Sequence, residues 1–208
     1  MHLFRVVAWI VAGVYATIPA FWIFTHPLIE RWRRRGLASY QLLVLCWMCS
    51  ILLVLWITAH GRVAPLYTTG LIPWVAALAC WSMGAIIYSR IPEFGFSRFL
   101  GKYEIAADKN SAEDKKQESV REMVSTGMHG WVRHPIYLGH LFMMIGWTAA
   151  AGTIAVYELL ALAWLTAPLM ILMEERELVS RFGDAYRVYQ RRVPMIVPRS
   201  VKIFRSPA

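Results

Sequence analysis

The sequence predicts an all-α integral membrane protein, and three observations support that prediction. Hydrophobic residues make up 58% of the 208 residues and charged residues 17%, against about 25% charged residues in soluble domains. The uncharged residues are concentrated in long runs, and a membrane-spanning helix needs about 20 apolar residues. The net charge of +9 comes from basic residues placed at the ends of those runs. This composition excludes a disordered chain, a collagen-like fibre and a disulfide-rich secreted scaffold.

Three uncharged runs in the first half of the chain each have the length of one spanning helix. They cover residues 6–24, 36–59 and 63–89. A fourth run, residues 135–173, has Glu158 as its only charge and would be about 58 Å long as one helix at 1.5 Å per residue. That length is too great for one span, and Gly152 near its middle permits a tight turn. We therefore expect five transmembrane helices, the last two forming a helical hairpin over residues 135–150 and 154–173.

The basic residues predict the orientation of the chain in the membrane. Of the 22 Lys and Arg, four lie in the loop after the first run (residues 31–35), eight in residues 90–133 and eight after residue 173. Only Arg5 and Arg62 lie on the other side of the membrane. Basic residues accumulate on the cytoplasmic side of membrane proteins. We expect a bacterial-type inner-membrane protein with its N-terminus outside and its C-terminus in the cytoplasm. Nucleic acid is not needed to explain the basicity, and no nucleic-acid-binding motif is present.

Composition divides the chain into residues 1–89, a three-helix membrane region, and residues 90–208, in which two polar segments flank the hairpin. The polar segments 90–134 and 174–208 fall on the same predicted side of the membrane. A 45-residue polar insertion is long for a simple connector. We therefore expect the two segments to meet over the hairpin and form a cytoplasmic site. The alternative is an unstructured loop followed by an amphipathic tail.

The tail is predicted to be a cytoplasmic helix that ends near residue 192 and is interrupted at Phe182-Gly183. Asp184 suits the cap of its second part. Tyr186, Tyr189 and Val193 then lie on one face, because residues three or four apart are neighbours on a helix. Tyrosines and arginines together are typical of a helix at the membrane interface.

Two clusters of ionisable residues lie at the predicted cytoplasmic ends of the hairpin. The first is in residues 133–140, Arg-His-Pro-Ile-Tyr-Leu-Gly-His. A proline suits the first position of a helix, and the N–H groups at a helix start attract anions, as does the adjacent Arg133. His134 and Tyr137 share a face. The second group is Glu174-Glu175, and adjacent carboxylates at the membrane edge need a matching cation.

Because a hairpin returns residue 174 to the level of residue 134, we expect one pocket with a helix start, a histidine, a tyrosine and two carboxylates. Such a pocket suits a zwitterionic ligand or one with a positive centre. Alternatively, His134 and Arg133 are ordinary interface residues, and Glu174 and Glu175 pair with arginines of the tail. No metal site is expected, because the six histidines show no HxxxH or HExxH spacing. The three cysteines lie in apolar runs and predict packing rather than redox chemistry.

The C-terminal half contains several short motifs that follow one another along the chain and are specific only in combination. They are residues 126–139 (Thr-Gly-Met-His-Gly-Trp-Val-Arg-His-Pro-Ile-Tyr-Leu-Gly), Glu174-Glu175, Phe182-Gly183, Tyr186, Tyr189 and residues 192–194 (Arg-Val-Pro). In this combination the chain resembles the isoprenylcysteine carboxyl methyltransferase family and the related phospholipid methyltransferases. The resemblance covers about residues 120–198, and residues 1–89 show no comparable signature.

The resemblance implies a membrane methyltransferase that uses S-adenosyl-L-methionine and takes a lipid-like or small hydrophobic acceptor from the bilayer. Residues 90–208 would be its catalytic region, with the cofactor closed in by the hairpin and the C-terminal segment. Catalytic roles are implied for Arg133, His134 and Tyr137. Cofactor contacts are implied for Arg121, Met123, Val124, His129, His134, Pro135, Tyr137, Glu174 and Glu175. In our mechanism hypothesis, Arg133 and the helix start hold the cofactor carboxylate, and Glu174 holds its ribose or amino group.

The chain departs from the family at three positions. The family often has His where Arg121 stands and Tyr where His129 stands. The isoprenylcysteine enzymes also have an Arg that holds the substrate carboxylate, and Met170 occupies that place here. The acceptor therefore stays open between a hydrophobic carboxylate, a phospholipid amine and a small thiol. Alternatives of another class are a sterol-reductase-like oxidoreductase and a non-catalytic membrane adaptor.

Overall fold

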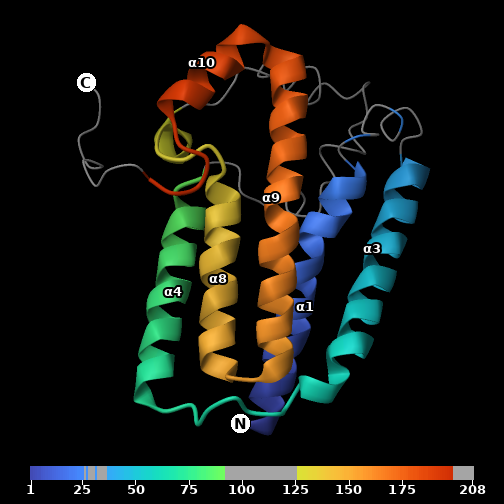
Figure 1. Cartoon of the computed structure of the whole chain (residues 1–208), viewed down its shortest axis with the longest axis vertical. Coiled ribbons are helices and arrows are strands. Elements are labelled where there is room, and N and C mark those ends of the chain that lie inside the picture. Colours follow the sequence, from blue (N-terminus) through green and yellow to red (C-terminus); the bar gives the residue numbers. More distant parts are fainter. Residues whose placement is uncertain (26, 28–30, 32–36, 92–125, 199–208) are drawn as a thin grey trace.

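The computed structural model describes residues 1–25, 27, 31, 37–91 and 126–198, and these residues form a bundle of helices (Figure 1). Within them no β-strand is present, only an isolated bridge between Pro65 and Thr153. The helices are α1 (His2–Thr25), α3 (Leu37–Thr58), α4 (Leu71–Ser89), α8 (Pro135–Ala151), α9 (Ile154–Phe182) and α10 (Asp184–Arg192), with 3-10 turns η2 (Ala59–Gly61) and η3 (Gly127–Gly130). The all-helical prediction is confirmed for this part of the chain.

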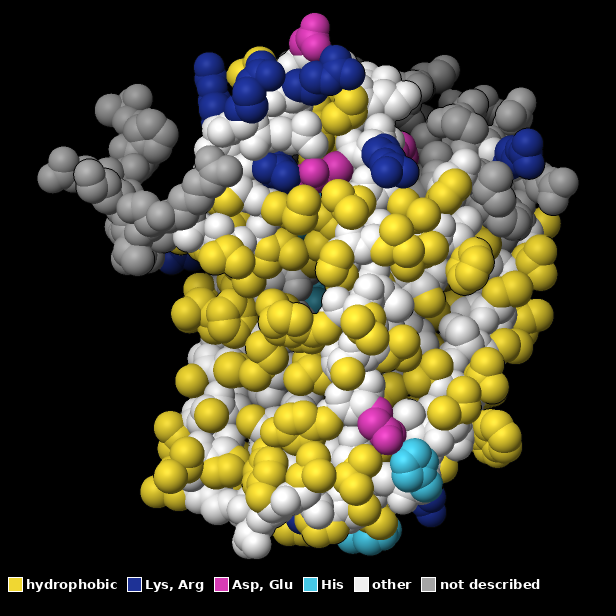
Figure 2. Space-filling model, viewed as in Figure 1, with side chains coloured by type: hydrophobic (Ala, Val, Ile, Leu, Met, Phe, Trp, Pro, Cys, Tyr) yellow, Lys and Arg dark blue, Asp and Glu magenta, His cyan; other side chains and the backbone are white. Residues whose placement is uncertain are grey.

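Four of the described helices, α1, α3, α4 and α9, are long and apolar enough to cross a membrane. Figure 2 shows hydrophobic side chains over most of the visible surface. Large apolar side chains on α3 and α4, such as Leu52, Trp56, Leu71 and Ile72, are exposed, which a soluble protein avoids. α8 has 17 residues and a length of about 26 Å, so the fifth span stays a prediction.

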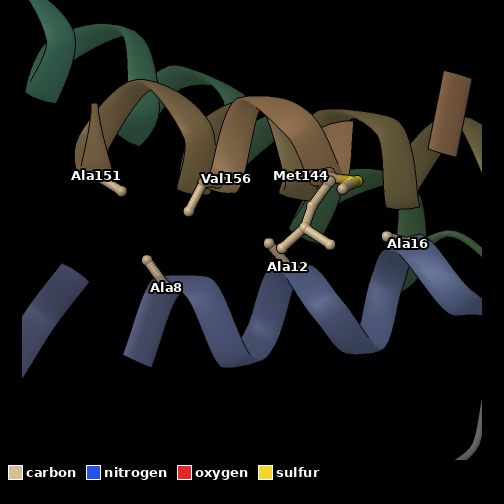
Figure 3. Close-up of a cluster of buried hydrophobic side chains, with 7 residues drawn as sticks. Ala8, Ala12, Ala16, Met144, Ala151 and Val156 are labelled. Carbon is tan, nitrogen blue, oxygen red and sulfur yellow. The ribbon is translucent and has the colours of Figure 1, made fainter. Parts of the chain in front are cut away.

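The two hairpin helices lie inside the bundle (Figure 1). α8 packs against α4 on one side and against α1 and α9 on the other, while α3 packs mainly against α1 at the edge. Ala8, Ala12 and Ala16 form a stripe of small residues on α1, and they face Met144 of α8 and Val156 of α9 (Figure 3). Small side chains let helices approach closely. This contact holds the hairpin at a fixed depth against the first helix.

The two ends of the bundle differ in charge. We call the end where α8 begins and α9 leaves the bundle the basic end, because Lys and Arg side chains gather there in Figure 2. The opposite end, at the turn between α8 and α9, we call the turn end. Gly152 makes this turn in the left-handed conformation with φ of 57°, and an added Cβ would meet the Tyr67 ring at 2.9 Å. The predicted turn at Gly152 is confirmed.

The third uncharged run, residues 63–89, contains a spanning helix that is shorter than the run. α4 begins at Leu71, and the preceding residues cross under the hairpin turn. The amide of Leu66 donates to Gly152 O over 2.8 Å, and the amide of Ile154 donates to Ala64 O over 3.1 Å. Pro65 has no N–H to give to a helix, so this segment pairs with the hairpin instead.

The tail has the interruption that the sequence predicts. α9 continues to Phe182, Gly183 has a φ of 59°, and α10 follows. Tyr186, Tyr189 and Val193 form the predicted cluster and are buried. The cap predicted for Asp184 was wrong, since its side chain caps no helix and instead pairs with Arg187 at 2.9 Å.

Candidate functional site

The site lies at the basic end, where α8 begins. His134 is the N-cap of α8 and Pro135 its first residue, as predicted, and both side chains are buried. The chain beyond α10 returns to this point. The amide of Arg133 donates to Pro194 O over 2.9 Å, and the amide of His134 donates to Met195 O over 3.1 Å. These bonds place the tail directly over the start of the hairpin.

A buried ionic network joins the start of α8 to α9 and α10. Glu175 is at its centre. Its Oε1 accepts from Arg133 Nε over 2.6 Å and from His134 Nε2 over 3.0 Å, and its Oε2 accepts from Gln190 Nε2 over 3.0 Å. The side chains of Arg133, His134 and Glu175 are 9%, 3% and 8% exposed. Charges buried to this degree are tolerated only when they are paired and hydrogen-bonded.

The remaining contacts of Arg133 are also inside the protein. Its Nη1 donates to the carbonyl oxygens of Gln190 and Val193. Our hypothesis gave this guanidinium to a cofactor carboxylate, but the structure turns it toward Glu175 and the tail. Pro135 is likewise fully buried. Pro135 therefore builds the start of α8, and Arg133 holds the tail over it.

His134 connects this network to a more open region. Its Nδ1 is 3.4 Å from Glu174 Oε2, and the Glu174 side chain is 26% exposed. Its ring stacks on Tyr137, with centroids 5.6 Å apart and planes 17° apart. Burial by itself would lower the pKa of His134, but hydrogen bonds and ion pairs with Glu174 and Glu175 outweigh it and raise the pKa to about 9. The imidazole is therefore charged at neutral pH.

Of the other residues predicted to contact the cofactor, His129 lies near the start of α8 and three lie outside the described residues. His129 Nδ1 is 3.3 Å from Arg133 O, so His129 is held against the start of α8. Arg121, Met123 and Val124 lie outside the described residues. The five residues brought together are Arg133, His134, Tyr137, Glu174 and Glu175.

Sequence reasoning missed two hydrogen bonds from α10. Gln190 supplies the amide that satisfies Glu175, and the hydroxyl of Tyr189 donates to His129 O over 2.6 Å. The spacing of Tyr186, Tyr189 and Val193 predicts a shared helix face and hence the burial of Tyr189. A single glutamine in a basic helix carries no comparable signal.

Comparisons with known proteins find several methyltransferases among the relatives of this chain. A methanethiol S-methyltransferase of Mycobacterium tuberculosis is 30% identical over 180 residues, which cover 84% of this chain and 66% of that protein. Methanethiol S-methyltransferase 2 of Bradyrhizobium diazoefficiens is 48% identical over 69 residues, 33% of this chain and 26% of that protein. Protein-S-isoprenylcysteine O-methyltransferase of Schizosaccharomyces pombe is 35% identical over 77 residues, 36% of this chain and 33% of that protein.

The class defined by the fold and these relatives is that of helical membrane proteins related to methyltransferases. More particularly, the chain belongs to an isoprenylcysteine carboxyl methyltransferase-like membrane family, through identities that are modest and mostly local. The chain spans about a quarter to a third of the Bradyrhizobium and Schizosaccharomyces proteins. A Delta(14)-sterol reductase of Mus musculus is 32% identical over 81 residues, 19% of that protein. No family model and no solved structure matches the chain.

Proposed function

We propose that the protein is an S-adenosyl-L-methionine-dependent methyltransferase that acts on a hydrophobic acceptor at the membrane. One observation carries the proposal: the start of α8 and the acidic pair on α9 meet beside the Tyr137 ring at the basic end. The names of the methyltransferase relatives support the same reaction class. By the positive-inside rule, the basic end faces the cytoplasm.

The side chains at this place suit the cofactor. S-adenosyl-L-methionine has a sulfonium, an amino group and ribose hydroxyls, which prefer carboxylates and aromatic faces. Glu174 is the partly exposed carboxylate and Tyr137 the partly exposed ring. In our proposal, Glu174 binds the amino or ribose group and Tyr137 lies against the sulfonium. When bound, the cofactor supplies a methyl group to the acceptor.

Arg133 and Glu175 act as positioning residues in this proposal. Their buried contact fixes His134, Tyr137 and Glu174 relative to one another. Methyl transfer is an in-line displacement that depends mainly on alignment and on exclusion of water, so a rigid frame serves the chemistry directly. From the resemblance, Arg121, Met123, Val124 and His129 are proposed as further cofactor contacts.

The acceptor is proposed to be neutral and hydrophobic. Met170, which stands at the family's carboxylate-binding position, is 1% exposed on α9. A thioether offers no clamp for a carboxylate. The relatives named for methanethiol favour a small thiol within this class.

The test is cofactor binding followed by transfer. Calorimetric titration of the purified protein in detergent should detect S-adenosylhomocysteine binding and no binding of a nicotinamide dinucleotide. Labelled methyl from S-adenosyl-L-methionine should then reach at least one member of a panel of alkyl thiols, membrane lipids and prenyl-cysteine analogues. Nicotinamide binding in place of S-adenosylhomocysteine binding would overturn the proposal in favour of a reductase.

A further inference from the structure

α10 turns its apolar residues toward the protein and its basic residues outward. Residues of α9 cover the apolar side, in one buried cluster made of Leu178, Val179, Phe182, Tyr186, Tyr189 and Val193. The other side carries the exposed residues Arg187, Arg191 and Arg192, and Lys and Arg side chains gather at this end of the molecule in Figure 2. Because its apolar side is already covered by protein, α10 presents a basic surface to its surroundings.

The protein itself neutralises this basic surface only in part. Arg187 Nη1 is 2.9 Å from Asp184 Oδ1, in a contact where both side chains are more than half exposed. Among the residues that the structure describes, no hydrogen bond or ion pair engages the side chains of Arg191 and Arg192. Two adjacent guanidinium groups of this kind attract anions, and each can bind a phosphate through two parallel hydrogen bonds.

The hydrogen bonds of the tail place it at the edge of the membrane. On α9, Leu172 is 48% exposed and Arg176 is exposed, so the apolar span gives way to charge between them. Glu175 at this boundary contacts His134 at the start of α8, and the amide of His134 donates to Met195 O. Figure 1 shows the chain beyond α10 returning to the start of α8. This part of the chain therefore lies where the hairpin enters the bilayer.

An apolar segment follows the arginines at the same level. Residues 195–197 are Met-Ile-Val, and Val197 is 77% exposed. At a membrane surface, buried apolar area and attraction between basic residues and anionic lipids add together in binding. An acidic protein would use the arginines alone, whereas a lipid surface uses the arginines and the apolar segment. The combination favours lipid. We call Arg187, Arg191, Arg192 and residues 195–197 the tail surface.

We propose that the tail surface binds anionic phospholipid headgroups, with its arginines on the lipid phosphates and Val197 among the acyl chains. The carbonyl oxygens of residues 193–195 lie between these two parts of the tail surface, and they accept from Arg133 and His134. Bound lipid therefore holds the tail closed over the start of α8. Anionic lipid in the leaflet at the basic end becomes a ligand that stabilises the buried ionic network.

Hydrogen exchange in nanodiscs, followed by mass spectrometry, measures whether lipid holds the tail. The amides of Arg133 and His134 should exchange on the order of 10-fold more slowly in nanodiscs that contain phosphatidylglycerol than in phosphatidylcholine alone, because each arginine near an anionic surface contributes about fivefold. High salt should reduce the difference, because it screens surface charge. The slowing should disappear in the double variant Arg191→Gln with Arg192→Gln. It should persist in Arg62→Gln, the matched control at the turn end.

The position of Val197 is tested separately by thiol labelling. In Val197→Cys, a membrane-impermeant maleimide should react more slowly in nanodiscs with phosphatidylglycerol than in phosphatidylcholine alone. Asp184→Cys, at the exposed far end of α10, should react equally in both. The parent gives the background, since its three cysteines lie within α3 and α4.

The proposal is overturned if exchange at Arg133 and His134 in the parent is equal in the two lipids, or if the double variant keeps the slowing. Equal labelling of Val197→Cys in both lipids would overturn it as well. Slowing by soluble polyglutamate but not by phosphatidylglycerol would replace lipid with an acidic protein as the partner. The comparison of lipids in the parent needs no variant to fold, and none of these measurements depends on methyl transfer.

Discussion

Each end of the bundle places a glutamate of α9 against a histidine, and the surroundings of the two contacts differ sharply. At the turn end, His60 Nε2 is 3.3 Å from Glu158 Oε1, with the side chains 64% and 40% exposed. At the basic end, His134 Nε2 is 3.0 Å from Glu175 Oε1, with the side chains 3% and 8% exposed. Arg133 and Gln190 also bind Glu175. The same two residue types thus form a solvated surface pair and a buried network.

The difference between the two contacts shows where this small bundle holds a fixed arrangement of charge. An exposed pair is screened by water and contributes about 0–1 kcal/mol. A buried pair contributes to specificity only when its remaining hydrogen-bonding groups are satisfied. At the basic end, satisfying them requires α8, α9 and the tail together, and Glu174 and Tyr137 are aligned as a result. The proposed cofactor site is therefore at the basic end.

The largest expected effect is from Glu175→Gln. Removing this charge leaves Arg133 buried without a counter-ion and His134 with Glu174 as its remaining carboxylate partner, and breaking a buried pair costs about 3–5 kcal/mol. Glu158→Gln is the control and should change stability by less than about 1 kcal/mol. The free energy of unfolding in micelles, followed by circular dichroism during chemical denaturation, measures both. Equal effects of the two variants would remove the distinction between the ends.

Glu174→Gln should act on binding more than on folding. This carboxylate is partly exposed, and a hydrogen bond to a charged group is worth about 1.5–3 kcal/mol. The dissociation constant for S-adenosylhomocysteine should rise about 10- to 100-fold, as measured by calorimetry. The melting temperature should fall less than in Glu175→Gln, because His134 keeps Glu175 as a partner. Parental affinity in this variant would mean that Glu174 is not a cofactor contact.

The stability of the protein should fall between about pH 6.5 and pH 9. The pKa of His134 is 6.5 in the unfolded chain and is raised to about 9 in the folded protein by Glu174 and Glu175, against the lowering effect of burial. The contribution of the charged imidazole to the free energy of unfolding is therefore complete below pH 6.5. This stabilisation is lost as the pH rises through about 9, the pKa of His134 in the folded protein. The shift of the His134 pKa corresponds to a loss of about 3 kcal/mol in the free energy of unfolding. Thermal unfolding across this range should show the fall in the parent and not in His134→Gln, and parallel profiles would contradict the assignment.

The smallest effect is expected from Gln190→Ala. It removes one hydrogen bond from Glu175 Oε2 and leaves the contacts with Arg133 and His134, so the cost should be about 1 kcal/mol. Gln41→Ala on the exposed face of α3 is the control and should be neutral. Chemical denaturation compares the two. A neutral Gln190→Ala would show that water replaces the amide without cost.

Much of the fold follows from local patterns in the chain. The apolar runs predicted the membrane helices, Gly152 the turn of the hairpin, and Phe182-Gly183 the break before α10. Residues 63–70 belong to an uncharged run with the composition of a span, but they lie outside α4 and pair with residues 152–154 instead. Composition measures apolarity, and it does not show which backbone groups find partners in a distant segment.

At the candidate site too, some contacts could be predicted from the sequence and others could not. A hairpin of known length places residue 174 beside residue 134, and the sequence alone therefore predicted the contact between His134 and the acidic pair. The direction in which Arg133 turns was not predictable, because its acceptors are Glu175 and the carbonyls of Gln190 and Val193. Those acceptors reach it only when the tail folds back over α8.

The sequence by itself determined the membrane class, the hairpin, the family resemblance and the residue types at the site, because each of these depends on spacing within one segment. The tertiary structure decided which charges are buried and which are solvated. It also decided that Gln190 completes the network and that Tyr15, Tyr88 and His140 meet although they come from three helices. Burial and ring contacts depend on how helices pack side by side, and that packing is a property of the whole bundle.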